Sequence, residues 1–293
     1  MRDFSYIAAN TVSEAVTLLD EKGQAARILA GGTDLIVQVR EARRDVDWMI
    51  DIKSIPEVNV LDYNADTGLT LGAAVECYKI YVVDEICDAY PGLIDATKII
   101  GGTAIQGRAA VGGNLCNASP AADCIPPLIV LNATCVIAGP NGERELPVEQ
   151  FCTGPGQTAL ENGEMLVSLK IPAPASNSSS FYLRFIPRNE MDIAVVGAGA
   201  SVTLDDAKQT IVSARIALAA VAPTPLFAEG ASALLVGREV SDTTAIDEAA
   251  GAAQAIARPI SDMRGTAEQR THLVGVLTRR ALNGAIQRIR DDA

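Results

Sequence analysis

The stretch Ala30-Gly31-Gly32-Thr33-Asp34 joins a predicted strand, residues 27–30, to a predicted helix, residues 35–40. Two adjacent glycines allow positive φ angles and let the backbone approach a ligand closely. The start of the following helix offers unpaired N–H groups and the positive end of the helix dipole. This combination favours a bound anion such as phosphate. Strand–Gly-Gly–helix turns also occur without a ligand, so the motif alone leaves both interpretations open.

A second glycine-rich stretch covers residues 101–117 and includes Ala110-Val111-Gly112-Gly113-Asn114. It contains few charges, and its N–H groups and short side chains could donate to a diphosphate or a ribityl chain. Asn117 belongs to the same stretch, and Asp123 follows it, where a carboxylate could accept hydrogen bonds from sugar-like hydroxyls. The alternative is an ordinary long loop, but long loops in compact domains are uncommon unless they are functional. The sequence therefore favours a ligand site here.

The two glycine-rich stretches lie far apart in the chain, in separate α/β regions, which predicts one extended ligand held between two lobes. A dinucleotide fits such a site. A third stretch, residues 195–202, contains Gly197 and Gly199 but no third glycine, and a strand and a turn are expected after it. A nicotinamide dinucleotide fingerprint needs a helix at that point. We therefore expect residues 195–202 to form a buried strand.

Strand and helix signals divide the chain into three parts, and the predicted fold class is α+β. The two lobes of a ligand-binding domain are expected over residues 1–55 and 56–175. Residues 173–180, Ala-Pro-Ala-Ser-Asn-Ser-Ser-Ser, form the clearest linker because they lack an apolar period and are rich in turn formers. A smaller C-terminal α+β domain is expected over residues 181–293, with a three-stranded sheet covered by helices.

Charge, composition and the N-terminal sequence argue against several functional classes. The chain has 293 residues and a net charge of −12, which argues against a nucleic-acid partner. No apolar run is long enough to cross a membrane, and the N-terminal residues lack the layout of a signal peptide, so a cytoplasmic location is expected. The six cysteines include no Cys-x-x-Cys pair, and His272 is the single histidine. We therefore expect free thiols, no metal site and no histidine-based acid–base catalysis.

The two glycine motifs, followed by Asn117-Ala118-Ser119-Pro120 and Asp123, resemble those of the FAD-binding (medium) subunits of molybdenum hydroxylases. That family includes the flavin subunits of carbon monoxide dehydrogenase and xanthine dehydrogenase. Further matches follow in order along the chain: Glu164-Met165-Leu166, and Tyr182 with Arg184. The resemblance covers essentially the whole chain.

The resemblance implies a two-lobed, vanillyl-alcohol-oxidase-like FAD domain closed by the smaller C-terminal domain. It implies that the two glycine motifs surround the FAD diphosphate and ribityl chain, with Asp123 at the ribityl region and Leu166 near the flavin. Tyr182 and Arg184 match positions that approach the isoalloxazine ring. The complete set implied for the cofactor is Ala30, Gly31, Gly32, Thr33, Asp34, Ala110, Val111, Gly112, Gly113, Asn114, Asn117, Asp123, Leu166, Tyr182 and Arg184.

The family function implied is electron transfer, with the redox chemistry on FAD and no catalytic acid or base in this chain. A large subunit would carry the molybdenum cofactor and bind the substrate, and a small subunit would carry [2Fe-2S] clusters, in a dimer of heterotrimers. The spacing from Cys116 to Cys124 leaves no room for the inserted cysteine-rich loop of hydroxybenzoyl-CoA reductases, so no further cluster is expected. The alternatives are a self-sufficient FAD-dependent oxidoreductase and an assembly protein without flavin. The electron acceptor stays open among NAD, oxygen and quinone-linked carriers.

Overall fold

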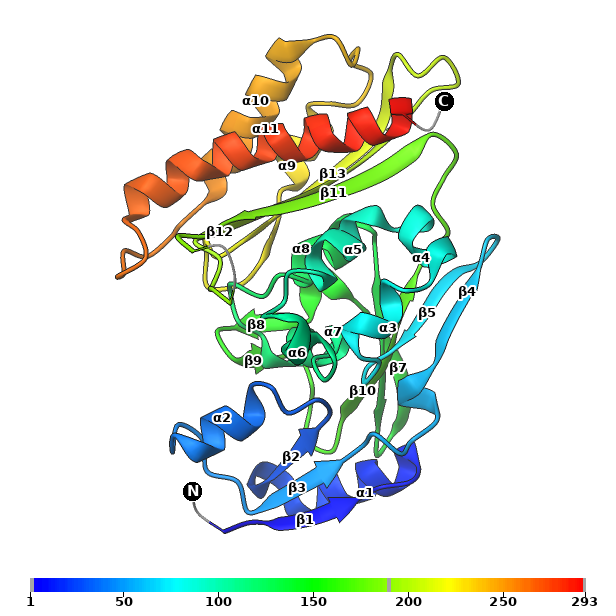
Figure 1. The fold of residues 1–293 in the computed structure, drawn as a ribbon, viewed down its shortest axis with the longest axis vertical. Helices are drawn as coiled ribbons and strands as arrows, with labels where there is room; N and C mark the ends of the chain where they lie inside the picture. Colours follow the sequence, from blue (N-terminus) through cyan, green and yellow to red (C-terminus); the bar gives the residue numbers. More distant parts are fainter. Residues whose placement is uncertain (1–2, 189–190, 292–293) are drawn as a thin grey trace.

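The computed structural model describes residues 3–188 and 191–291, which form three stacked layers (Figure 1). Each layer has its own sheet, and the sheets fall within residues 5–51, 61–171 and 178–227. The predicted α+β class is therefore confirmed at this level. The short strands β8 (Cys152–Gly154) and β9 (Gln157–Thr158) pair with each other outside these sheets. The domain boundaries at residues 55 and 175–181 stay predictions.

The first layer is a parallel sheet with the order β1-β3-β2. Its elements are β1 (Ser5–Ala8), α1 (Val12–Lys22), η1 (Gly23–Ala25), β2 (Ala26–Leu29), α2 (Leu35–Arg40) and β3 (Trp48–Asp51). Helix α1 begins where the Thr11 side chain accepts the N–H of Glu14, which satisfies one of the orphan donors of the first turn. Its apolar side, with Val16, packs on Ile50 of the central strand. Because β2 is an edge strand, the turn between β2 and α2 lies at the edge of this sheet.

The middle layer is an antiparallel sheet with the order β4-β5-β10-β6-β7. Its strands are β4 (Leu61–Asn64), β5 (Gly68–Gly72), β6 (Thr134–Gly139), β7 (Gly142–Pro147) and β10 (Met165–Ile171). Asn141-Gly142 turns β6 into β7, as the hairpin signal predicts. The helical segments are η2 (Glu57–Asn59), α3 (Cys77–Ile80), α4 (Asp84–Ala89), α5 (Pro91–Thr97), α6 (Thr103–Gln106), α7 (Val111–Asn117), α8 (Ile125–Val130) and η3 (Val148–Gln150).

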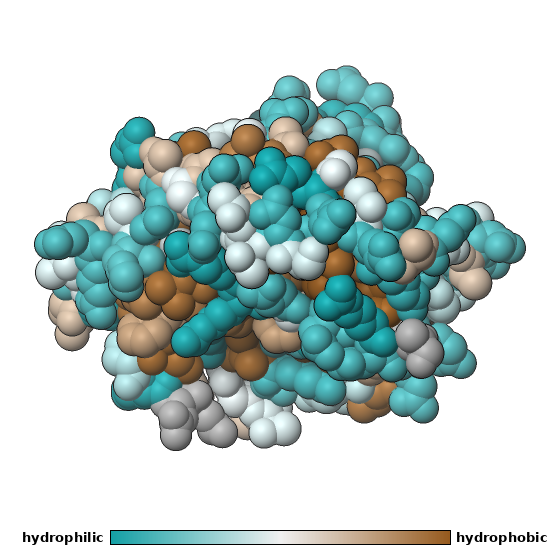
Figure 2. Space-filling model, turned by 90° about the horizontal axis from the view of Figure 1, so that it is seen from above, coloured by the Kyte–Doolittle hydropathy of each residue, from teal (hydrophilic) through white to brown (hydrophobic). Residues whose placement is uncertain are grey.

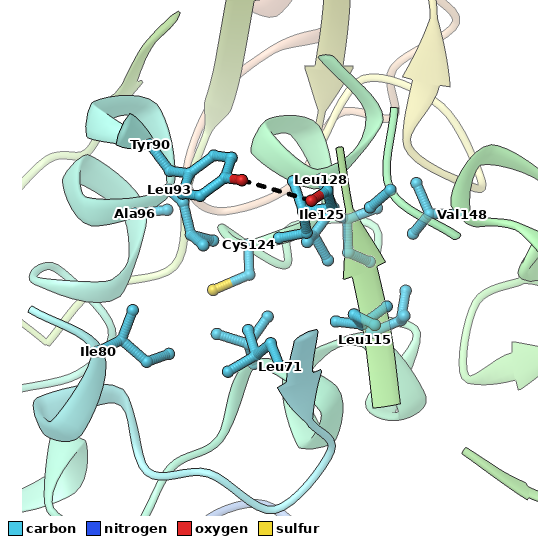
Figure 3. Packing of buried hydrophobic residues seen from close by; sticks show 14 of the residues in the cluster. Leu71, Ile80, Tyr90, Leu93, Ala96, Leu115, Cys124, Ile125, Leu128 and Val148 are labelled. Carbon is cyan, nitrogen blue, oxygen red and sulfur yellow. Dashed lines mark hydrogen bonds between the residues drawn. The ribbon is translucent and has the colours of Figure 1, made fainter. Parts of the chain in front are cut away.

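The largest hydrophobic core lies between this sheet and its helices (Figure 3). Tyr90, Leu93 and Leu128 are each 0% exposed and pack with Ile125 and Leu71. Burying a side chain of this size contributes about 1.5–3 kcal/mol. The Tyr90 hydroxyl donates to the carbonyl of Pro172 at 3.0 Å, so the polar end of this side chain is satisfied. Helix α8 carries two prolines near its start, where their missing N–H groups cost little.

The C-terminal layer differs from the expected three-stranded sheet, because it has four antiparallel strands in the order β11-β12-β13-β14. They are β11 (Ser178–Phe185), β12 (Val196–Leu204), β13 (Ile211–Ala219) and β14 (Leu226–Phe227). The three-stranded prediction is wrong because two residues of β14 are too few to show an alternating pattern. The linker is also shorter than expected, since β11 already begins at Ser178. The prediction of a buried strand over residues 195–202 is confirmed by β12.

Helices cover one side of the C-terminal sheet (Figure 1). They are α9 (Glu229–Ala233), α10 (Thr243–Ile256) and α11 (Ala267–Asp291). Buried residues of α11 recur at three- and four-residue spacing, as in Val274, Leu277, Ala281 and Ala285, which is the pattern of a helix with one apolar face. At Gly284 an added Cβ would lie 2.6 Å from the Phe181 ring, so a glycine is needed for this close helix–sheet contact.

The C-terminal domain is fixed to the middle layer by a salt bridge beside α5. Arg288 of α11 pairs with both carboxylate oxygens of Asp95 at 2.8 Å and donates to the carbonyl of Ser180. The Ser180 hydroxyl in turn accepts the N–H of Gly92 at 3.0 Å. A bidentate Arg–carboxylate pair gives direction as well as attraction. These contacts set the orientation of β11 over α5.

The outer face of the C-terminal layer is mainly hydrophilic, and hydrophobic side chains show through in separate areas (Figure 2). Met263 and Ile260, which are 93% and 69% exposed, belong to the segment between α10 and α11. Within the described part of the chain, no helix is both long and apolar enough to cross a membrane.

Candidate functional site

A pocket of about 400 Å³ lies between the first two layers. Its walls come from β2, the β2–α2 turn, α7 and residues 156–166. Strand β2 and helix α7 are far apart in the chain, so both predicted glycine motifs meet at one cavity. The interpretation of residues 101–117 as one long loop is wrong, because α6 and α7 form within it.

The β2–α2 turn contacts the second glycine-rich stretch, residues 101–117, at Gly31. A Cβ added there would lie 1.8 Å from the carbonyl oxygen of Arg108, so only glycine permits this approach. Gly32 has a φ of +73°, the left-handed region that favours glycine. Lys53 also fixes the start of the turn, because it donates to the carbonyl of Ala30 at 3.3 Å and to the Asp51 carboxylate at 2.7 Å. The turn is thus pressed against the segment that leads into α7.

Backbone donors gather around the pocket without protein acceptors. Within residues 3–188 and 191–291, the N–H groups of Gly31, Gly32, Thr33 and Asp34 have no acceptor. The same holds for the N–H groups of Gly112 and Gly113 in the first turn of α7. Unpaired N–H groups are rare in folded proteins unless water or a ligand satisfies them. Their convergence from the β2–α2 turn and the first turn of α7 makes this pocket suited to a diphosphate.

The two glycines of α7 have different roles. An added Cβ at Gly112 would lie 2.5 Å from the carbonyl oxygen of Ala73, so Gly112 allows α7 to pack on the end of β5. At Gly113 the nearest atom would be the Cβ of Ala110, 3.9 Å away, so the protein itself leaves that space open. Gly113 lines the pocket, whereas the Val111 side chain is buried in the core. The open space above Gly113 lets a ligand reach the backbone.

Side-chain amides link the two walls. Gln38 of α2 donates to Asn117, at the end of α7, at 3.1 Å, and both residues line the pocket. Asn114 also lines the pocket and accepts the N–H of Cys124 at 3.1 Å. Asn114 therefore connects the pocket to the segment that carries Asp123.

Asp123, Tyr182 and Arg184 form a buried network beside the pocket. The Tyr182 hydroxyl donates to Asp123 at 2.7 Å, and Arg184 makes an ion pair with the other carboxylate oxygen. Burial raises the pKa of Asp123, while the Arg184 guanidinium and the two hydrogen bonds act against that shift. Burial, together with the charge of Asp123, also raises the pKa of Tyr182 well above its ordinary value. The tyrosine therefore remains a neutral donor at physiological pH.

The same network reaches the pocket wall. Arg184 donates to the carbonyl of Ile99 at 3.0 Å, and the next residue, Ile100, lines the pocket. The C-terminal domain thereby holds one edge of the cavity, although Asp123, Tyr182 and Arg184 are not among its lining residues in the described chain.

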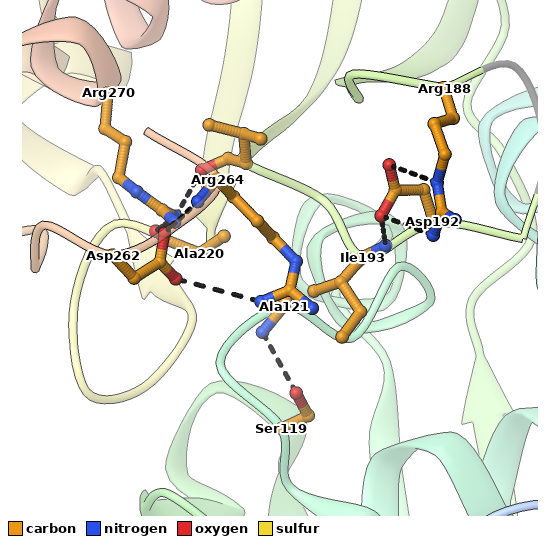
Figure 4. A network of polar contacts seen from close by, with 10 residues as sticks. Ser119, Ala121, Arg188, Asp192, Ile193, Ala220, Asp262, Arg264 and Arg270 are labelled. Carbon is orange, nitrogen blue, oxygen red and sulfur yellow. Dashed lines mark hydrogen bonds and ion pairs between the residues drawn. The ribbon is translucent and has the colours of Figure 1, made fainter. Parts of the chain in front are cut away.

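A second contact from the C-terminal domain supports the segment after α7 (Figure 4). Arg270 of α11 is 4% exposed and donates to the carbonyl of Ala220 at 3.1 Å and to Asp262 at 2.8 Å. The N–H of Ala220 donates to the carbonyl of Pro120 at 2.6 Å. Arg270 is thus linked through the backbone to the segment between α7 and Asp123.

The structure brings most of the expected site residues together. The expected residues that line the pocket are Ala30, Gly31, Gly32, Thr33, Asp34, Ala110, Gly112, Gly113, Asn114, Asn117 and Leu166. The residues that line it but were not expected from the sequence include Arg27, Gln38, Arg44, Ile100 and Cys116, together with Gly156, Thr158 and residues 160–165 of the segment before Leu166. Gly156 and Gly163 could have indicated turns in this last segment from the sequence, and both have a positive φ in the structure.

Comparison with known families gives two matches along the chain. Residues 2–174 match the FAD binding domain in molybdopterin dehydrogenase, and residues 181–285 match the CO dehydrogenase flavoprotein C-terminal domain. The chain belongs to the flavoprotein subunits of molybdopterin dehydrogenases. The resemblance stated from the sequence is therefore confirmed, and FAD is the cofactor of this family's N-terminal domain.

Individual relatives agree over nearly their whole length. The chain is 33% identical to the carbon monoxide dehydrogenase medium chain of Hydrogenophaga pseudoflava, covering 96% of each chain. It is 31% identical to the putative xanthine dehydrogenase FAD-binding subunit of Escherichia coli (strain K12), covering 98% of this chain and 97% of the relative. Among solved structures, carbon monoxide dehydrogenase from Hydrogenophaga pseudoflava matches with a TM-score of 0.93, 33% identity and 98% coverage of both chains. Quinoline 2-oxidoreductase from Pseudomonas putida 86 matches with a TM-score of 0.88, 29% identity and 98% coverage of both chains.

The donors in the pocket fit the cofactor of this flavoprotein family. An FAD diphosphate carries negative charge and accepts hydrogen bonds, which are the two properties that unpaired backbone N–H groups select. The six cysteines are free thiols, and no group of three or more His, Cys, Asp or Glu residues in the described chain could hold a metal ion. His272, on α11, is exposed.

Proposed function

We propose that this chain is the electron-transfer subunit of a heterotrimeric molybdenum hydroxylase. It would accept electrons from [2Fe-2S] clusters of a small partner subunit and deliver them to an external acceptor. A large partner subunit would carry the molybdenum cofactor and oxidise the substrate, and the complex would be a cytoplasmic dimer of heterotrimers. The relatives named as medium chains or FAD-binding subunits of carbon monoxide and xanthine dehydrogenases support this proposal.

The observation that carries the proposal is the set of unpaired N–H groups in the two touching glycine motifs. In our proposal those of Gly31, Gly32, Gly112 and Gly113 hold the FAD diphosphate. When bound, FAD supplies the redox chemistry, and the protein supplies binding and orientation. The two lobes that enclose the pocket are proposed to be a vanillyl-alcohol-oxidase-like domain.

We extend the proposal to the side chains at the edge of the C-terminal domain. Asp123 would contact the ribityl chain, Leu166 would lie near the flavin, and Tyr182 and Arg184 would approach the isoalloxazine ring. Support comes from Leu166 in the pocket wall and from the bond between Arg184 and Ile99, beside that wall. A cation at this place would stabilise a reduced, anionic flavin ring.

A self-sufficient FAD-dependent oxidoreductase is the second candidate. It requires a substrate site with its own acid or base, and the single histidine, on the exposed side of α11, does not provide one. The chain also matches relatives named as a medium chain and an FAD-binding subunit over nearly their full length, which favours the subunit role.

Purification of the chain from its native host tests the proposal. The expected result is co-purification with one larger and one smaller chain, with FAD, molybdenum and iron all present in the assembly. FAD on a lone chain that oxidises an organic substrate without metal would refute the subunit role.

A further inference from the structure

Arg270 of α11 is a buried cation that does not line the pocket. Its Nη1 donates to the carbonyls of Val195 at 2.7 Å and Ala220 at 3.1 Å, and its Nη2 pairs with Asp262 at 2.8 Å. Its Nε is buried without an acceptor among the described residues. Burying a charge is costly unless its contacts compensate for the lost water. Arg270 therefore needs these three contacts, and through them it joins three segments of the C-terminal domain.

The three segments lie at one end of the C-terminal sheet. Val195 directly precedes β12, Ala220 directly follows β13, and Asp262 lies between α10 and α11. Figure 4 shows Ala220 and Asp262 beside Arg270, on the side of the molecule where Ala121 of the middle layer lies. A single guanidinium group thus fixes the part of the C-terminal domain that meets the segment after α7.

Ala220 has a left-handed backbone, with a φ of +64°. This conformation is unfavourable for an L-residue with a Cβ. Here both backbone groups of Ala220 are bound, because its carbonyl accepts from Arg270 and its N–H donates to Pro120 at 2.6 Å. Among the described residues, the bond to Pro120 is the only backbone–backbone hydrogen bond between residues 3–172 and 178–291. The left-handed turn is therefore what directs this N–H across the domain boundary.

The acceptor, Pro120, lies in the short segment that connects α7 with Asp123. Two residues earlier, Ala118 also has a left-handed backbone, with a φ of +47°, and its carbonyl accepts the N–H of Gly156 at 2.9 Å. The segment is thus held by one turn from the middle layer and one from the C-terminal domain. A shift of Pro120 would move both the end of α7, which lines the pocket, and the Asp123 carboxylate.

We propose that Arg270 is a positioning residue for the flavin site: it holds Ala220 in its left-handed conformation and so keeps residues 118–123 in the arrangement that binds FAD. This inference rests on the proposed flavin site and extends it to a residue of another domain that does not touch the pocket. Without the guanidinium group, Ala220 relaxes to an ordinary backbone conformation and its N–H leaves Pro120. The binding-competent arrangement is then only partly populated, and the apparent affinity for FAD falls by that fraction.

The central comparison is between Arg270→Met and the double variant Arg270→Met with Ala220→Gly. Methionine keeps an unbranched chain in the buried space but cannot bind the two carbonyls. Glycine adopts a positive φ without a Cβ penalty, so the turn in the double variant no longer depends on the arginine. Arg270→Lys keeps the positive charge without the fork that reaches two carbonyls, and it gives the same comparison if Arg270→Met does not fold.

Two controls separate positioning from stability. Arg258→Met makes the same chemical change in the same connection between α10 and α11, where the Arg258 side chain bonds only to the nearby carbonyls of Ala255 and Ala257. Val274→Ala removes two methyl groups at a position of α11 that is 0% exposed, which lowers the stability of the C-terminal domain without touching the link to Pro120.

Each flavin-free full-length chain is titrated with FAD by flavin fluorescence, and the same samples are unfolded thermally. Arg270→Met should bind FAD about ten-fold more weakly than the parent, the equilibrium equivalent of the cost of a left-handed alanine. Adding Ala220→Gly should restore most of this loss. Ala220→Gly alone and Arg258→Met should keep the parent affinity, and Val274→Ala should lower the melting temperature with little effect on FAD.

Three results would overturn the positioning role. They are parent-like FAD affinity in Arg270→Met, no recovery on adding Ala220→Gly, or a loss of affinity in Val274→Ala as large as that in Arg270→Met. The last result would mean that the effect runs through general stability. Failure of the parent chain to bind FAD would instead refute the flavin site itself, and the role of Arg270 with it.

Discussion

The substitution Gly113→Leu separates flavin binding from protein stability. Gly113 lies in the first turn of α7, and an added Cβ would meet nothing closer than 3.9 Å. Leucine favours helix by about 0.5–1 kcal/mol over glycine, so the flavin-free protein should become slightly more stable. For a chain of this size the melting temperature should rise by about 2 °C.

The same side chain would fill the space through which a diphosphate reaches the backbone. Loss of two hydrogen bonds to a charged group costs about 3–6 kcal/mol, which corresponds to roughly a 10²- to 10⁴-fold weaker affinity for FAD. Flavin fluorescence during titration of the apoprotein measures the affinity, and thermal unfolding of the same sample measures stability.

Gly251→Leu is the matched control, because Gly251 is an exposed glycine in α10 with nothing within 4 Å of an added Cβ. It should gain similar helix stability and keep the parent affinity for FAD. If Gly113→Leu binds FAD as tightly as the parent, the diphosphate does not lie over α7. If its apoprotein melts well below the parent, the space above Gly113 is not open.

Three further substitutions test the surroundings of the site. Gly31→Ala forces a Cβ into the opposite backbone, so we expect a loss of about 1–3 kcal/mol in unfolding free energy together with loss of FAD; parent-like values in both would refute the tight approach. Tyr182→Phe leaves a buried oxygen of Asp123 without its donor, which should cost about 1–3 kcal/mol in urea denaturation, and a neutral effect would mean that the hydroxyl is dispensable. The hydrogen bond from Arg144 lowers the pKa of Glu164, so the stability that this carboxylate contributes is present above its ordinary pKa and is lost as the pH falls through the lowered value. Glu164→Gln should therefore flatten the acid side of the plot of unfolding free energy against pH, and an unchanged slope would contradict this assignment.

Much of the site follows from local sequence, because its key interactions are made by the backbone. The glycine pairs at positions 31–32 and 112–113 indicate a close approach of the backbone without any knowledge of the fold, and Gly32 also has the positive φ that glycine favours. The hairpin at Asn141-Gly142 and the buried strand β12 follow from equally local rules. These features depend on a few neighbouring residues, so periodicity and turn chemistry are sufficient to find them.

Features that depend on distant residues could not be predicted in this way. Strand β14 has only Leu226 and Phe227 and exists because β13 offers it partners. Arg27 belongs to the pocket because the first layer faces residues 158–164, and no local signal marks that arrangement. The network of Tyr182 with Asp123 also joins residues from two layers, so its geometry appears only in the folded chain.

The central claim, that this pocket holds one FAD, is tested most directly by reconstituting the purified chain, removing free flavin and analysing what unfolding releases. The expected result is one FAD per chain for the parent and almost none for Gly113→Leu. Release of FMN, absence of flavin from the parent, or equal FAD content in both proteins would contradict the claim.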